Sequence, residues 1–297
     1  MTPGGAPPFD PFVPRRLEIG AGHMSYVDEG AGPPVLFVHG TPTWSFDWRR
    51  LIRTLAPTHR CVAPDLIGFG HSDRPRDFAY TPEAHAVALA EFVERLGLER
   101  FTLVVHDFGG PIGLPLALRD PSPVARVVVL NSWMWSLAGD AYYERGARVI
   151  GSPLGRFLYR WANLSIEVIT PSAYGDRRKL TPEIHRALRE RFPDRWSRGA
   201  VLWTLAKSLL GSSDHYESLW QRRSRLRRLP ALIVWGMRDP AFPPRLLDRW
   251  SEALPQAKLV QLADAGHWPH EEEPERVATE LAAFLGASAH SRGPAQT

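Results

Sequence analysis

Residues 101–113 read FTLVVHDFGGPIG, and this stretch decides the fold. Its first half is a short apolar run rich in valine, as expected of a strand that is buried on both faces of a parallel sheet. Asp107 follows the run directly, and Gly109 and Gly110 come next, in a segment that reads as a helix over 108–119. Small residues permit a sharp turn between a strand and a helix. The stretch therefore predicts a strand, a tight turn that presents Asp107, and a helix.

The same alternation of strand and helix continues on both sides of this stretch. Further apolar runs predict buried strands at 34–38, 59–63, 124–130, 231–235 and 258–262. Helical patterns fall between the strands, near 46–56, 83–96, 244–253 and 274–285. Residues 16–30 predict two antiparallel edge strands. The chain is therefore expected to be an α/β protein with a mostly parallel, eight-stranded sheet covered by helices on both faces.

One long interval breaks this alternation. Residues 136–228 contain no buried-strand pattern and are rich in Trp, Tyr, Arg and Leu. We expect a helical insertion after the sixth strand, lying over the carboxyl ends of the strands, where ligands bind in open α/β sheets. The predicted organisation is a core domain of residues 16–135 and 229–287, a helical cap of residues 136–228, and flexible tails at residues 1–15 and 288–297.

Composition limits the class of protein. The chain has 297 residues, 44% of them hydrophobic, and no apolar run long enough to span a membrane. The first residues lack the features of a signal peptide, and Cys61 is the single cysteine, so a cytoplasmic protein without disulfides is expected. The formal charge is +4, and the densest basic run, residues 222–228, reads as a surface helix or linker. No zinc pattern or phosphate-binding loop is present, so no metal, cofactor or nucleic acid is predicted. The oligomeric state stays open.

Three further motifs follow predicted strands. HGTP at residues 39–42 turns the backbone toward the predicted site, so the N–H groups of Thr41 and Phe108 would form an oxyanion hole. Asp239 lies in WGMRD after the strand at 231–235, and His267 lies in AGHWP after the last strand. The chain order Asp107, Asp239, His267 is the order of nucleophile, acid and base in the α/β-hydrolase fold. Asp239 would then hold His267 in its working tautomer.

These motifs resemble the haloalkane dehalogenases of the α/β-hydrolase superfamily and their epoxide-hydrolase relatives. The resemblance covers residues 20–135 and 229–285. It rests on HGTPTWSFDWR (39–49), APDLIGFGHSD (63–73), HDFGGPIG (106–113), WGMRDP (235–240) and AGHWPHEEEP (265–274). In this family the acid follows either the strand that ends near Asn131 or the strand that ends near Trp235. Asn131 cannot serve as an acid, so the resemblance assigns that role to Asp239.

The resemblance also implies a reaction. An aspartate, here Asp107, attacks an electrophilic carbon and forms an alkyl-enzyme ester while a leaving group departs. The histidine, His267, then activates a water molecule that hydrolyses the ester. The expected partners are a small apolar substrate, water and a halide ion in the pocket, and no cofactor is needed.

The chain departs from the family beside the nucleophile. Similar dehalogenases usually have a tryptophan there, whose indole N–H holds the halide, whereas this chain has Phe108, which has no donor. In similar dehalogenases a second halide donor often stands at the position of Thr41, which offers a hydroxyl in this chain. We take as candidate leaving-group or pocket residues Asn131, Trp133, Trp135 and Trp161.

Three other functions remain open. An epoxide hydrolase would need cap tyrosines, normally two, and its candidates are Tyr142, Tyr143, Tyr159, Tyr174 and Tyr216. A decarboxylase that opens β-lactones is a second alternative, because residues 131–135 resemble that branch. A ligand receptor built on the same fold is the third, although the complete set of Asp107, Asp239 and His267 argues against it. The motifs therefore predict the nucleophile more firmly than the leaving group.

Overall fold

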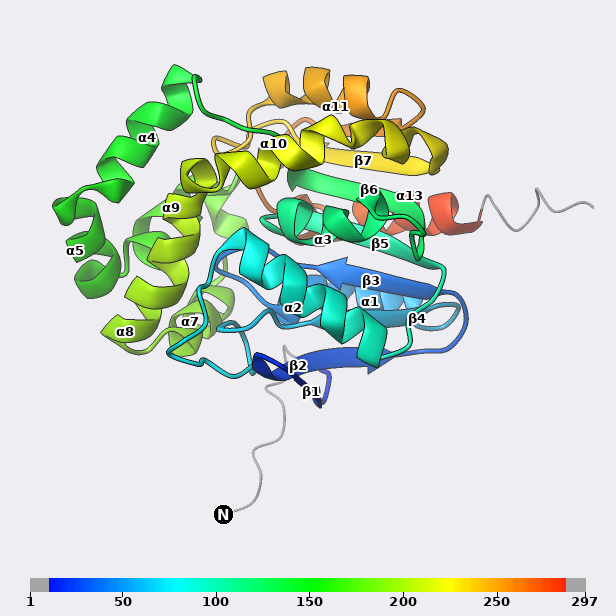
Figure 1. Cartoon of the computed structure of the whole chain (residues 1–297), viewed down its shortest axis with the longest axis horizontal. Coiled ribbons are helices and arrows are strands. Elements are labelled where there is room, and N and C mark those ends of the chain that lie inside the picture. Colours follow the sequence, from blue (N-terminus) through cyan, green and yellow to red (C-terminus); the bar gives the residue numbers. More distant parts are fainter. Residues whose placement is uncertain (1–10, 287–297) are drawn as a thin grey trace, which may run out of the picture.

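The structure is a computed structural model that describes residues 11–286 (Figure 1). One sheet has the strand order β1-β2-β4-β3-β5-β6-β7-β8. β1 and β2 pair antiparallel with each other, and β2 pairs antiparallel with β4; all other neighbours are parallel. The predicted eight-stranded, mostly parallel sheet with two antiparallel strands at one edge is confirmed. The strands are β1 (Arg15–Ile19), β2 (Gly22–Glu29), β3 (Pro34–Val38), β4 (Arg60–Pro64), β5 (Phe101–Asp107), β6 (Val124–Ser132), β7 (Ala231–Gly236) and β8 (Lys258–Leu262).

Both faces of the sheet are covered, which explains why its central strands are apolar without alternation. In β5, Phe101, Leu103 and Val105 belong to one core cluster and Val104 to the other, and every residue of the strand is buried. Helices α2 (Pro82–Arg95), α3 (Gly109–Leu118), α10 (Ser213–Gln221) and α11 (Leu247–Ala253) contribute to the first cluster. Helices α1 (Arg49–Leu55) and α13 (Pro274–Gly286) contribute to the second. The predicted helices at 46–56 and 244–253 begin with short 3₁₀ turns, η1 (Ser45–Trp48) and η6 (Pro244–Leu246).

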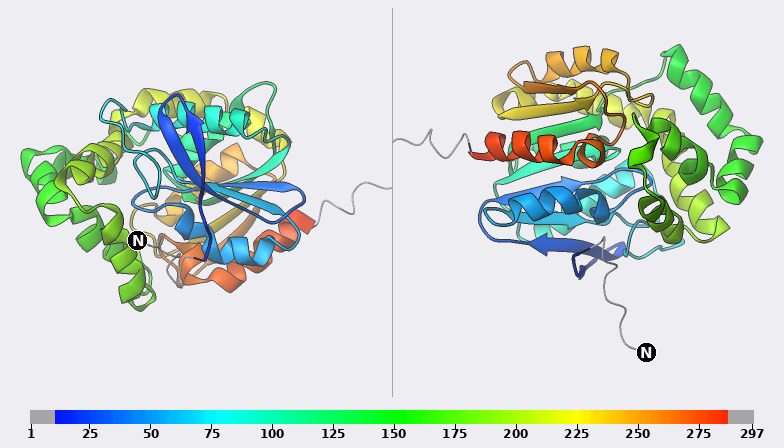
Figure 2. Two further views of the ribbon diagram at one scale, coloured as in Figure 1. Left: turned by 90° about the horizontal axis from the view of Figure 1, so that it is seen from below. Right: turned by 180° about the vertical axis from the view of Figure 1, so that it is seen from behind.

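Helices joined by loops make up the segment between β6 and β7, and we call it the helical insertion. Helices α4 to α9 of this segment gather at one end of the sheet, whereas α10 lies along its face (Figures 1 and 2). Two of them begin with a side-chain cap followed by proline, Ser152 before Pro153 and Thr181 before Pro182, a strong local signal for a helix start. The elements of this segment other than α10 are α4 (Ala141–Gly151), α5 (Pro153–Ala162), η2 (Ser165–Ile169), α6 (Thr170–Ala173), η3 (Arg177–Lys179), α7 (Pro182–Arg191), α8 (Arg195–Ser197), η4 (Arg198–Leu202), α9 (Trp203–Gly211) and η5 (Arg223–Arg228).

The basic run at residues 222–228 leads the chain back from the helical insertion to β7. Arg225 donates to the carbonyl of Leu118 at 2.8 Å, and Arg223 pairs with Glu252 at 2.7 Å. Several of its positive groups are therefore engaged within the molecule. Within residues 11–286, no helix is both long and apolar enough to cross a membrane. Of the predicted tails, residues 1–10 and 288–297 lie outside the described residues, and β1 already begins at Arg15.

A buried ion pair ties the start of α1 to α12 (Pro269–Glu272), the short helix that follows His267. Both side chains are almost fully buried, and two Arg49 nitrogens contact the two carboxylate oxygens of Glu271, one of them at 2.9 Å. Arg49 also donates to the carbonyl of Phe46 at 3.0 Å. Removing one partner would leave an uncompensated charge in the core, which costs far more than the net stabilisation that the intact pair provides.

We therefore predict that Arg49→Met lowers the free energy of unfolding by about 3–5 kcal/mol. The double variant Arg49→Met with Glu271→Met should be more stable than Arg49→Met alone, because no buried charge is left without a partner. Urea denaturation followed by circular dichroism measures both effects. Arg238→Met is the control, because the Arg238–Asp264 pair is exposed and should contribute only about 0–1 kcal/mol. A double variant less stable than the single one would contradict this account.

Candidate active site

Asp107 occupies a strained turn between β5 and α3. Its φ is +50°, a left-handed conformation that costs a non-glycine residue roughly 1–3 kcal/mol. The neighbouring strand holds the turn in place, because the Ser132 hydroxyl donates to the backbone carbonyl of Asp107 at 2.6 Å. Two glycines leave no room for a side chain. A Cβ on Gly40 would overlap the Asp107 carboxylate, and a Cβ on Gly109 would overlap the backbone carbonyl of Val38. The turn thus aims a buried carboxylate away from the sheet.

Two backbone N–H groups, those expected from the sequence to form an oxyanion hole, point at this carboxylate. The N–H of Thr41 donates to Asp107 Oδ2 at 2.8 Å, and the N–H of Phe108 also donates to the carboxylate. Burial raises the pKa of Asp107 to about 6, against the charge of His267 and these two hydrogen bonds, which lower it. The side chain is therefore ionised at neutral pH, because its pKa stays below 7.

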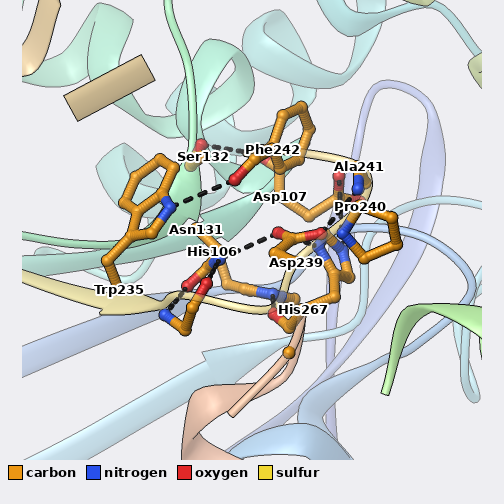
Figure 3. Close-up of polar contacts among 12 residues, drawn as sticks. His106, Asp107, Asn131, Ser132, Trp235, Asp239, Pro240, Ala241, Phe242 and His267 are labelled. Atoms are coloured by element: carbon orange, nitrogen blue, oxygen red, sulfur yellow. Dashed lines mark hydrogen bonds and ion pairs between the residues drawn. The ribbon is translucent and has the colours of Figure 1, made fainter. Parts of the chain in front are cut away.

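The structure brings His267 and Asp239 to the same place from two other strand ends (Figure 3). His267 Nδ1 lies 2.8 Å from Asp239 Oδ2, and His267 Nε2 lies 3.8 Å from Asp107 Oδ1. Because a carboxylate only accepts, Nδ1 carries a proton and donates it to Asp239. Burial lowers the pKa of His267, but the charge of Asp239, its hydrogen bond and the charge of Asp107 outweigh this effect and raise the pKa to about 9. The imidazole of His267 thus lies between two carboxylates, one that accepts its hydrogen bond and one that faces its other nitrogen.

Asn131 orients Asp239 and does not line the cavity described below. Its Nδ2 donates to Asp239 Oδ2 at 2.8 Å, and its Oδ1 accepts from the N–H of Gly236 at 2.8 Å (Figure 3). The other oxygen of Asp239 accepts from the N–H of Ala241 at 2.7 Å. Asn131 was a candidate leaving-group residue, and the structure places it at the acid instead. It joins the ends of β6 and β7, so it fixes where Asp239 can point.

Two residues that sequence reasoning overlooked hold the loop of His267. His106 Nε2 donates to the backbone carbonyl of His267 at 2.7 Å. Glu272 accepts from the N–H of Gly266 at 2.8 Å and from the N–H of Gly175, in the helical insertion, at 3.2 Å. His106 lies in the motif that contains Asp107, and Glu272 lies in the motif that contains His267. This proximity in the sequence could have identified them as supporting residues.

A cavity of about 580 Å³ opens above Asp107 and His267, a size that suits a small organic ligand. Strand-end loops form one wall, and α4, α5, α6 and α9 of the helical insertion form the other. Phe108, Phe242 and Trp268 are among its apolar lining. Besides Asp107 and His267, Arg145 is the one charged side chain that lines it. The cavity therefore favours an uncharged, largely apolar molecule.

None of the tryptophans predicted to hold a leaving group lines this cavity. Trp133 lies behind Phe108, with its ring edge-on at 4.8 Å, and Trp135 is packed between Trp220 and Trp250. Trp161 is 52% exposed on the outer side of α5. Trp133 and Trp135 point into the core beneath α10 and α11. Trp161 lies two residues after Tyr159, which faces the cavity, and two residues correspond to about 200° of rotation around α5, so Trp161 points outward.

One group of side chains in residues 11–286 is close enough to hold a metal ion. The ligand atoms of Asp47, His106 and His270 lie within 4.8 Å of one another, and all three residues are buried. Burial lowers the pKa of His106 well below its ordinary value, so this imidazole is neutral. The group lies behind His267 and does not line the cavity.

Comparison with known proteins defines the class first. Residues 33–274 match the family model of the alpha/beta hydrolase fold, and the chain belongs to that family. Within it, the chain belongs with the haloalkane dehalogenases. It is 36% identical over 286 residues to haloalkane dehalogenase 2 of Mycobacterium tuberculosis, which covers 94% of this chain and 97% of the relative.

Two other similarities bear on function. The chain is 32% identical over 283 residues to the cis-3-alkyl-4-alkyloxetan-2-one decarboxylase of Shewanella oneidensis, which covers 93% of this chain and 89% of the relative. Its structure resembles the crystal structure of the haloalkane dehalogenase DbeA from Bradyrhizobium elkani, with a TM-score of 0.84, 26% identity, and coverage of 94% of this chain and 100% of that chain. Both likenesses span the helical insertion as well as the sheet.

The network around His267 leads to a prediction about its charge. Asp239→Asn keeps the shape of the acid but removes its negative charge, so the pKa of His267 should fall well below its value of about 9 in the parent chain. Titration of the imidazole by nuclear magnetic resonance measures the change. Asp264→Asn, an exposed acid three residues before His267, is the matched control and should leave the titration unchanged. Equal shifts in the two variants would show that Asp239 does not set the pKa.

Proposed function

We propose that this chain hydrolyses small haloalkanes to an alcohol and a halide, with Asp107 as the nucleophile, His267 as the base and Asp239 as the acid. One observation carries the proposal: an ionised carboxylate on a strained turn faces both an apolar cavity and an imidazole that a second carboxylate orients. A carboxylate nucleophile suits attack at a saturated carbon, because it forms an ester that water can then hydrolyse. The similarity to haloalkane dehalogenase 2 of Mycobacterium tuberculosis supports the same activity.

In the first step, Asp107 Oδ1 attacks the carbon that bears the halogen. The new C–O bond forms as the carbon–halogen bond breaks, and the halide leaves with the bonding electron pair. Oδ2 keeps its hydrogen bond to the N–H of Thr41 throughout. The product of this step is a neutral alkyl ester of Asp107.

In the second step, His267 Nε2 takes a proton from water, and the water oxygen attacks the ester carbonyl carbon of Asp107. The N–H groups of Thr41 and Phe108 stabilise the negative charge that develops on Oδ2. The intermediate collapses to the alcohol and a free carboxylate, and one proton is released to solvent. Haloalkane and water thus give alcohol, halide and a proton.

The electrostatics of the pair fit this order of steps. The charge of Asp107 is one of the causes that raise the pKa of His267. Formation of the ester removes that charge, so the pKa of His267 falls at the stage when the imidazole has to accept a proton. The base is therefore activated by the first half of the reaction.

We also propose that residues 136–228 act as a cap over this site. Residues of α4, α5, α6 and α9 line the cavity, and Ala173 accepts a hydrogen bond from the N–H of His267 at 2.8 Å. An apolar wall over the nucleophile excludes bulk water, which strengthens every electrostatic interaction inside the site.

Opening of a β-lactone is the second candidate. Decarboxylases of cis-3-alkyl-4-alkyloxetan-2-ones from Shewanella oneidensis and Xanthomonas campestris are 32% and 30% identical to this chain. Attack by Asp107 on a lactone ring would break a carbon–oxygen bond in place of a carbon–halogen bond. Halide release, epoxide hydration and lactone loss, measured side by side on the purified chain, separate the candidates.

The covalent step leads to a direct prediction. His267→Gln should accumulate the alkyl ester after incubation with butyl bromide, because the ester forms but no base activates the water that hydrolyses it. Intact-protein mass spectrometry should show the mass of one butyl group, and peptide mapping should place it on Asp107. Asp107→Asn combined with His267→Gln should gain no mass. A His267→Gln chain that gains no mass from haloalkane, epoxide or lactone would disprove the nucleophile.

The pH dependence of the first step forms another prediction. The nucleophile has to be ionised, so the alkylation rate should fall as the pH drops through about 6, the pKa of Asp107. The charge of His267 lowers that pKa, so in His267→Gln the midpoint should move to higher pH. Single-turnover halide release between acidic and neutral pH measures the midpoint. An unchanged midpoint in the variant would show that the two side chains do not interact.

A further inference from the structure

The side chain that follows the nucleophile supplies no donor for the leaving group of the proposed reaction. Phe108 follows the nucleophile and lines the cavity, and its side chain has no hydrogen-bond donor. The indole N–H of Trp133 is buried without a partner, but the ring lies behind Phe108 and does not line the cavity. A halide that leaves into an apolar cavity without a hydrogen-bond donor loses the stabilisation that water gives it. Another group on the cavity wall has to supply the donor.

The structure separates the five tyrosines that sequence analysis could not rank. Tyr142 and Tyr143 donate to the carbonyls of Pro240 and Ala241 at 2.5 Å and 2.9 Å. Tyr216 donates to the carbonyl of Ser208 at 2.7 Å.

The other two tyrosines have no such bond, and only one of them reaches the site. Tyr174 stacks on Trp268 and does not line the cavity. Tyr159 is 3% exposed and lines the cavity, and its hydroxyl meets no hydrogen-bond acceptor within residues 11–286.

Tyr159 also lies within electrostatic reach of the nucleophile. Burial raises the pKa of its hydroxyl, and the negative charge of Asp107 raises it further. The hydroxyl therefore stays protonated and remains a donor at any working pH. It extends from α5, on the wall opposite the strand-end loops, so substrate carbon and leaving group can fit between Asp107 and Tyr159.

A second free hydroxyl stands on the opposite wall. Thr41 Oγ1 is buried without a hydrogen-bond partner, although Thr41 lines the cavity and its N–H is bound to Asp107. Buried hydroxyls without a partner are uncommon in folded proteins, and each costs free energy that a bound ligand can return. Thr41 Oγ1 is one such hydroxyl, and the Tyr159 hydroxyl, which also has no partner within residues 11–286, lies on the opposite wall of the same cavity. Together they supply two donors for a group that accepts hydrogen bonds.

We propose that the hydroxyl of Tyr159, together with that of Thr41, holds the leaving group as it departs from the carbon attacked by Asp107. This inference rests on the proposed function. During departure of a halide, both hydroxyls donate hydrogen bonds to the developing anion and keep their protons. With a β-lactone, the same donors would contact the ring oxygen that takes up the electron pair. Tyr159 thus takes the part that a tryptophan at position 108 would otherwise play.

The test uses three substrates that form the same butyl ester: butyl chloride, butyl bromide and butyl iodide. Any difference among them belongs to the first step, because the ester and its hydrolysis are identical. Chloride concentrates its charge most and leaves least readily, so it depends most on a donor. Tyr159→Phe should slow alkylation by butyl chloride on the order of 10-fold to 100-fold, with a smaller loss for bromide and the smallest for iodide. The rates are measured as mass gain over time in the His267→Gln background.

Tyr216→Phe is the matched control. It also removes a buried hydroxyl from the helical insertion, but that hydroxyl is bound to Ser208 and lies outside the cavity lining. It should keep the parent ratio of chloride, bromide and iodide rates. Thr41→Val should steepen the dependence on the halide in the same direction as Tyr159→Phe.

Two results would overturn the inference. The first is that Tyr159→Phe leaves the alkylation rates unchanged. The second is that it slows all three halides equally, which would indicate a change in the shape of the cavity and not the loss of a donor. Failure of the proposed haloalkane activity has a different signature, because the His267→Gln chain then gains no mass from any of the three halides. In that event the comparison is made on opening of an alkyl oxetan-2-one, where a slower reaction of Tyr159→Phe supports the inference and an unchanged one overturns it.

Discussion

The left-handed backbone at Asp107 is the constraint on which the rest of the site depends. A residue with a φ of +50° at the end of β5 does not stay there by its own preference, so the surroundings have to hold it. The Ser132 hydroxyl from β6 binds its carbonyl, the N–H of Thr41 from the loop after β3 binds its carboxylate, and Gly40 leaves room for it. Three neighbouring strand ends therefore position one side chain. The stability of the parallel sheet is the source of that precision, because its strands carry the partners in fixed register.

The groups around Asp107 and His267 hold Asp239 and the His267 loop in place while, in the proposed reaction, Asp107 and His267 change charge in turn. Asp239 receives three hydrogen bonds, from Asn131, His267 and Ala241, and so it stays in place as the imidazole changes charge. His106 supports the loop from behind as a neutral group and adds no competing positive charge. Such a network acts by orientation, since the only charges that change during the proposed reaction are those of Asp107 and His267.

The sheet and the three charged residues could be predicted from sequence because their signals are local. The ten residues FTLVVHDFGG indicate a buried strand, a turn and the start of a helix. Asp239 and His267 likewise lie shortly after apolar runs. The wall of the cavity gave no such signal. Whether Tyr159 or Trp161 faces Asp107 depends on which side of α5 is turned toward the cavity, and both residues are aromatic. The sequence also gave the wrong place for Asn131, because a residue after a strand can either line a pocket or orient a neighbouring side chain. Its hydrogen bonds to Gly236 and Asp239 show that it orients Asp239.

This difference between the two walls has a mechanistic meaning. The proposed nucleophile, base and oxyanion hole come from strand ends, where register leaves little freedom. The hydroxyl of Tyr159 comes instead from α5, which packs mainly on other helices of the helical insertion. A change on the helical insertion can therefore alter which leaving group is stabilised without disturbing the nucleophile. In the proposed reaction, the hydrogen-bond donor opposite Asp107 and the shape of the cavity between them thus decide which leaving group is stabilised.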